Sequence, residues 1–78
     1  MNKKEKLFKL IEFWLQHGMA HTDAQITAEA GLSIADLDEL WSEAEIILDK
    51  ARNKPEKPPT GEKLLEEVRS WIDFRVGT

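Results

Sequence analysis

Apolar side chains recur at three- and four-residue intervals along four stretches of this 78-residue chain, and no stretch alternates between apolar and polar residues. The first pattern gathers apolar side chains on one side of an α-helix, whereas a half-buried β-strand needs the alternation. We therefore predict an all-α chain with helices over residues 3–17, 23–30, 34–52 and 62–75.

The predicted second and third helices each begin with a capping box, a four-residue pattern in which side chains satisfy free amide groups of the first turn. Thr22 with Gln25 provides one such pattern, and Ser33 with Asp36 provides the other. Between the two helices stands Gly31, a residue that tolerates the left-handed backbone conformation of a tight helix exit. The two helices are therefore expected to meet in a short turn.

All three prolines, Pro55, Pro58 and Pro59, lie in the stretch 53–61 among charged residues. Proline breaks a helix interior, so this stretch is predicted to be an extended connector. A chain of this length has room for one hydrophobic core. We therefore expect one domain overall, with a tri-helical head at residues 1–52, the proline-rich connector at 53–61 and an amphipathic C-terminal helix at 62–78.

Composition excludes several classes of function. The absence of cysteine excludes disulfides, thiolate zinc sites and thiol nucleophiles. His17 and His21 have the four-residue spacing of metal ligands on one helix, but Gly18 is expected to end the helix between them, and only Asp23 stands nearby as a further ligand. We predict no metal site, no cofactor and no enzyme, because a domain this small rarely encloses a pocket that tunes catalytic carboxylates.

The chain also lacks the signals of membrane insertion and export. No apolar run approaches the roughly 18 residues of a membrane span, and no signal-peptide core follows the N-terminal lysines. We therefore expect a cytoplasmic protein with no membrane partner.

Residues 26–41 carry the spacing of a helix-turn-helix motif. A short helix that packs steeply on a longer one needs an apolar residue five positions before the turn glycine, here Ile26, and a small residue directly before it, here Ala30. An apolar plug, a helix cap and two inward-facing residues of the second helix then follow. These positions hold Leu32, Ser33, Leu37 and Trp41. We therefore predict a small tri-helical helix-turn-helix bundle with the C-terminal helix as its fourth element.

This run resembles the DNA-binding head of TetR-type repressors, whose pattern reads roughly I-A-x-E-A-G-V-S-x-x-x-L-x-x-x-F. The resemblance covers residues 26–41 only and departs from the pattern at Thr27, where the family usually has alanine. It implies that the start of the second motif helix would enter the major groove of DNA. The corresponding positions are Ile34, Ala35, Asp36, Asp38 and Glu39.

The charge of that segment opposes DNA binding. Three of the five positions are acidic, and none carries the Arg, Lys, Asn or Gln that usually reads base edges. Attraction to phosphates supplies much of DNA affinity, whereas this chain has a net charge of −4. We therefore do not expect direct DNA binding.

We predict instead a non-catalytic interaction module that regulates a partner protein. Its third helix would present an acidic side to a basic patch, such as that of a nucleic-acid-binding protein. The residues of this side are Asp36, Asp38, Glu39, Glu43 and Glu45.

Three alternatives stay open. The acids can form an ordinary solvated helix face, or the chain can be a structural subunit of a larger assembly. It can also be a small DNA-binding regulator, as a monomer or a dimer, that contacts phosphates through lysines of the first helix. Those lysines are Lys3, Lys4, Lys6 and Lys9.

The three tryptophans stand one in each long predicted helix, as Trp14, Trp41 and Trp71. We expect them to converge in the core of the bundle. Trp71 has a second interpretation as a binding anchor, because tryptophan is enriched at interface hot spots and Phe74 and Val76 make this end of the helix apolar. A homodimer formed through the last helix is a further alternative.

Overall fold

The computed structural model describes residues 2–53 and 60–76, and these residues form helices without any strand. The helices are α1 (Lys3–His17), α2 (Asp23–Ala30), α3 (Ile34–Arg52) and α4 (Glu62–Val76). The predicted all-α chain and its four helices are confirmed, with α4 ending one residue later than expected. The three prolines of the predicted connector lie outside the described residues.

Side-chain caps fix the start of α2 and of α3. The Thr22 hydroxyl accepts a hydrogen bond from the Gln25 amide at 3.2 Å, and the Gln25 side chain accepts one from the Thr22 amide at 3.1 Å. Ser33 and Asp36 repeat this exchange at the start of α3, with both distances at 3.1 Å. Both predicted capping boxes are therefore confirmed.

The turn between α2 and α3 depends on a glycine. Gly31 ends α2 with φ 72° and ψ 34°, which is the left-handed helical region. Its amide and that of Leu32 both donate to the Thr27 carbonyl, at 3.0 and 3.2 Å. The chain therefore reverses within three residues and enters α3 directly.

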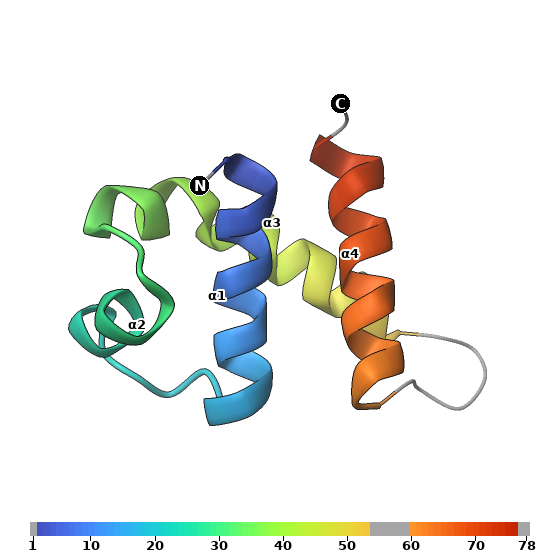
Figure 1. Ribbon diagram of the computed structural model, residues 1–78, viewed down its shortest axis with the longest axis horizontal. Coiled ribbons are helices and arrows are strands. Elements are labelled where there is room, and N and C mark those ends of the chain that lie inside the picture. The colour runs from blue at the N-terminus through green and yellow to red at the C-terminus, as the bar shows by residue number, and fades with distance from the viewer. Residues whose placement is uncertain (1, 54–59, 77–78) are drawn as a thin grey trace.

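One apolar core joins all four helices. In Figure 1, α1 and α4 run side by side, α3 crosses behind both, and α2 lies at the far side of α1. The side chains that α1 and α3 bury completely include Leu7, Leu10, Ile11, Ala44, Ile47 and Ala51. Because α1 and α3 each contact all of the other helices, these two helices form the centre of the packing.

Helix α4 docks on α1 and α3 of its own chain. Its inner side contributes Leu64, Val68 and Ile72, which are no more than 8% exposed. The spacing of these three residues, at every fourth position, gathers them on one side of the helix. The C-terminal helix therefore belongs to the same core as the preceding helices.

The tryptophans occupy different depths. Trp14 is 2% exposed and meets Trp41 edge to face, with ring centroids 5.0 Å apart. Trp41 and Trp71 are half-buried and pack against the outside of the core. The expected convergence therefore holds for Trp14 and Trp41, while Trp71 lies at the margin of the bundle.

None of the helices among residues 2–53 and 60–76 has the length and apolar character needed to cross a bilayer.

Candidate interaction surface

The five predicted acids of α3 fall into two groups in the structure. An α-helix turns by about 100° per residue, so positions 36 and 43, seven residues apart, project along nearly the same line. Asp36 and Glu43 occupy that line and are half-buried beside neighbouring helices. Asp38, Glu39 and Glu45 lie on other sides of α3 and are exposed to solvent.

Asp36 holds the start of α3 in place and links it to α1. Besides closing the capping box with Ser33, its carboxylate accepts a hydrogen bond from the Lys6 ammonium group at 3.0 Å. This bond to Lys6, together with the bonds from Ser33, lowers the pKa of Asp36. The charge of Asp36 is therefore engaged inside the protein.

Glu43 links α3 to α4 in the same manner. Its two carboxylate oxygens accept hydrogen bonds from Nε and Nη2 of Arg75, at 2.6 and 3.4 Å. The hydrogen bond lowers the pKa of Glu43 and raises that of Arg75. Glu43 is therefore also an internal partner.

The remaining three acids form the surface that we call the exposed acidic face, defined as Asp38, Glu39 and Glu45. They make no ion pair and no side-chain hydrogen bond with any other residue that the structure describes. Two exposed apolar residues of the same helix accompany them, Ile34 at 50% and Ile46 at 40% exposure. The solvent-exposed part of α3 therefore combines negative charge that has no partner among the described residues with apolar area.

The lysines of α1 also divide into two groups. Lys4 pairs with Asp73 of α4 at 3.1 Å, and Lys6 pairs with Asp36. These pairs compensate the unfavourable placement of cations at a helix N-terminus. Lys3 and Lys9 stay exposed, so half of the predicted phosphate-contacting lysines are engaged by carboxylates of the same chain.

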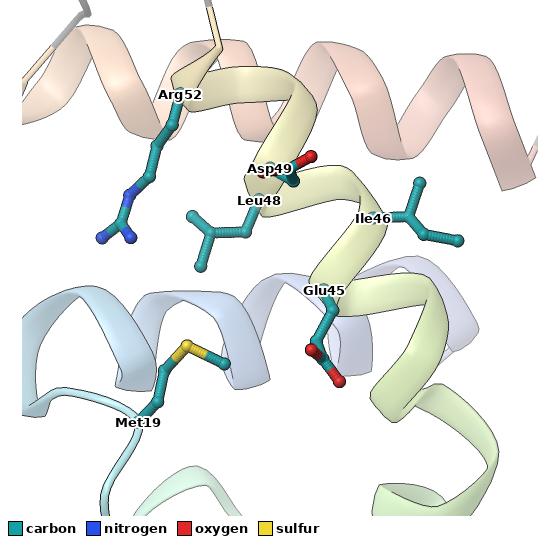
Figure 2. A pocket seen from close by; sticks show the side chains of 6 residues that line it. All are labelled: Met19, Glu45, Ile46, Leu48, Asp49 and Arg52. Carbon is teal, nitrogen blue, oxygen red and sulfur yellow. The ribbon is translucent and has the colours of Figure 1, made fainter.

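Beside the exposed acidic face lies a shallow hollow that the sequence did not reveal. Met19, in the loop after α1, reaches toward Leu48 of α3, and Glu45, Asp49 and Arg52 line the rim (Figure 2). Met19 is 42% exposed, whereas Leu48 is 4% exposed. Leu48 fits the helical pattern of α3, but Met19 lies outside any helix, so periodicity could not assign its position.

Trp71 lies on the seam between α3 and α4. The Lys50 ammonium group stands 5.5 Å from its ring centroid, and the Phe74 ring meets it edge to face at 5.7 Å. Phe74 itself is 78% exposed. Phe74 is therefore far more exposed than the predicted anchor Trp71, which is half-buried.

The two histidines pack around Phe13. Their rings lie 4.9 and 5.2 Å from the Phe13 ring, and Nε2 of His21 donates a hydrogen bond to the His17 carbonyl at 2.6 Å. Gly18 ends α1 between them, with φ 85°. Over residues 2–53 and 60–76, no three or more histidine and carboxylate side chains gather as metal ligands would.

No protein-family model matches this sequence, and no curated protein or solved structure is significantly similar to it. The assignment of a function therefore depends on the chemistry of the surface itself.

Proposed function

We propose that this protein is a non-catalytic interaction module on a helix-turn-helix scaffold, and that its exposed acidic face binds a basic surface of a partner protein. The short turn at Gly31 and the capped start of α3 support the scaffold. The partner would be a regulated protein whose basic patch serves to bind nucleic acid, and the module would cover that patch.

The observation that carries this proposal is the division of the acids of α3. Asp36 and Glu43 have cationic partners in the same chain, whereas Asp38, Glu39 and Glu45 have none among the described residues. An unpaired cluster on one helix creates a local negative potential. Such a potential speeds association with a positive surface and makes binding sensitive to salt.

A capture experiment tests the proposal. The tagged wild-type chain and the variant Asp38→Asn/Glu39→Gln/Glu45→Gln are incubated with extract of the source cells at low and moderate salt. We expect the wild-type chain to retain a basic protein, with less retained as salt rises, and the variant to lose it. Asp36 is left intact because its substitution would remove the cap of α3.

A matched control separates position from total charge. The variant Glu29→Gln/Glu62→Gln/Glu66→Gln neutralises three exposed carboxylates on α2 and α4, so both variants have a net charge of −1 instead of −4. We expect this control to capture the partner like the wild-type chain. Equal losses in the two variants would show that net charge matters and the exposed acidic face does not.

The alternative is a small DNA-binding regulator on the same scaffold. The observation that supports this alternative is the exposure of Lys3 and Lys9 on α1, for which no ion pair is found among residues 2–53 and 60–76. A gel shift with mixed-sequence duplex DNA at low salt decides between the two. We expect no retarded band, because the reading position at the start of α3 carries Asp38 and Glu39.

A further inference from the structure

We infer that the hollow between Met19 and Leu48 receives an apolar side chain from a cationic amphipathic helix of the partner. This inference rests on the proposed function and specifies the part of the partner that the surface fits. Two features of the hollow support it: its apolar floor and the placement of charge around its rim.

The floor consists of two side chains with different roles. Leu48 is packed in the core and forms a rigid part of the floor, whereas Met19 extends from the loop after α1 and is exposed to solvent. Methionine has three rotatable bonds and a polarisable sulfur, so it adapts to the shape of an incoming apolar group. Ile46 also lines the hollow, and its side chain projects from the opposite side of α3 to Leu48 in Figure 2.

The rim sets the charge that the occupant needs. Glu45 and Arg52 stand at opposite ends of the hollow in Figure 2, seven residues or roughly 10 Å apart along the helix. Asp49 lies between them and accepts a hydrogen bond from Asn53 at 2.8 Å. Two carboxylates against one guanidinium give a negative rim. Asp38 stands seven residues before Glu45, on nearly the same line of α3.

This combination selects one class of occupant. A cationic amphipathic helix places apolar side chains on one face and Lys or Arg beside them, so it matches an apolar floor within a negative rim. A nucleic acid or an anionic membrane brings the wrong charge. A second copy of this chain carries a net charge of −4 and has two of its α1 lysines already paired.

Two synthetic peptides provide the probe. Both are 18-residue helices with the same leucine pattern, and the charged positions are all lysine in one and all glutamate in the other. Binding is followed by the fluorescence anisotropy of a label on the peptide. We expect the lysine peptide to bind the full chain with salt-dependent affinity, and the glutamate peptide not to bind.

Substitutions then locate the binding site. Met19→Ser should weaken binding of the lysine peptide about tenfold, since it removes the contact surface of one apolar side chain. Glu45→Lys should weaken it as well and should reduce the discrimination between the two peptides. Phe74→Ser is the matched control, because it removes a more exposed apolar side chain on α4, and it should leave the affinity unchanged.

The outcomes separate this inference from the proposed function. If Met19→Ser binds the lysine peptide like the wild-type chain, or if the wild-type chain binds neither peptide, the inference is wrong. The capture experiment with the triple variant does not use these peptides, so its result can still support the proposed function. Equal binding of both peptides would also overturn the inference, because the negative rim would then select nothing.

Discussion

Neutralising the exposed acidic face should leave the fold at least as stable as before. The perturbation is Asp38→Asn/Glu39→Gln/Glu45→Gln, which keeps side-chain size and changes helix propensity little. In a helix, like charges four residues apart destabilise by about 0.2–0.5 kcal/mol per pair. Glu39 faces Glu43, and Glu45 faces Asp49, at this spacing.

Removing these two repulsions should stabilise the chain by at most ~1 kcal/mol. The gain in stability should be smaller for the pair Glu39 and Glu43, because Arg75 already compensates the charge of Glu43. Asp38 adds nothing at this spacing, since Ile34 and Ser42 are its neighbours four residues away. The acids are therefore expected to be slightly unfavourable for folding, which agrees with a surface kept for binding.

The assay is urea denaturation followed by tryptophan fluorescence and helical circular dichroism, at low salt and at high salt. The difference between variant and wild type should shrink at high salt, because exposed charges are screened. Ser33→Ala serves as the comparison and should destabilise by ~1 kcal/mol at both salt concentrations through loss of the cap. A loss of more than ~1 kcal/mol in the triple variant would refute the reasoning, since acids that hold the fold together are not free to bind a partner.

Three further predictions concern the fold that carries the surface. The partners of Asp36 and Glu43 lower the pKa values of both carboxyls in the folded chain, so the unfolded chain binds protons at a higher pH than the folded chain does. The free energy of unfolding should therefore decrease as the pH drops from the ordinary values of 3.8 and 4.5 through the lower pKa values of the folded chain. Glu43→Gln should make this decrease smaller when acid denaturation is measured. Gly31→Ala should destabilise by ~1 kcal/mol in urea titrations, because φ is 72° there, and an unchanged midpoint would argue against the left-handed turn. Ile72→Ala should lower the free energy of unfolding by about 2–5 kcal/mol, from a total of roughly 4–12 kcal/mol, and should lower the melting temperature accordingly. A decrease of less than ~1 kcal/mol would mean that α4 is not docked on the core.

The sequence predicted the helices well because their signals are local. Capping residues and glycine act within one turn of the chain, so Ser33 and Gly31 marked the limits of α2 and α3 correctly. The lysines at the start of α1 stand where the helix dipole disfavours cations, and Lys4 and Lys6 pair with carboxylates of other helices. Such a misplaced charge is itself a local signal, although it does not name the partner.

Contacts between distant helices could not be predicted in the same way. The sequence marks Asp36 as part of a capping box but does not mark Asp36 or Glu43 for an ion pair, because their partners lie 30 and 32 residues away. Only the relative placement of the helices shows which acids are paired. The position of Met19 could not be predicted for a similar reason, because a loop residue shows no helical periodicity and its neighbour Leu48 lies far away in the sequence, on α3.

The most direct test of the binding surface is a map of backbone amide chemical shifts. The isotope-labelled chain is titrated at low salt with the lysine peptide, and shifts are recorded along all four helices. We expect the largest changes between Asp38 and Asp49 of α3 and at Met19, with little change at the start of α1. The largest changes around Phe74, or an even spread over every exposed carboxylate, would contradict this expectation.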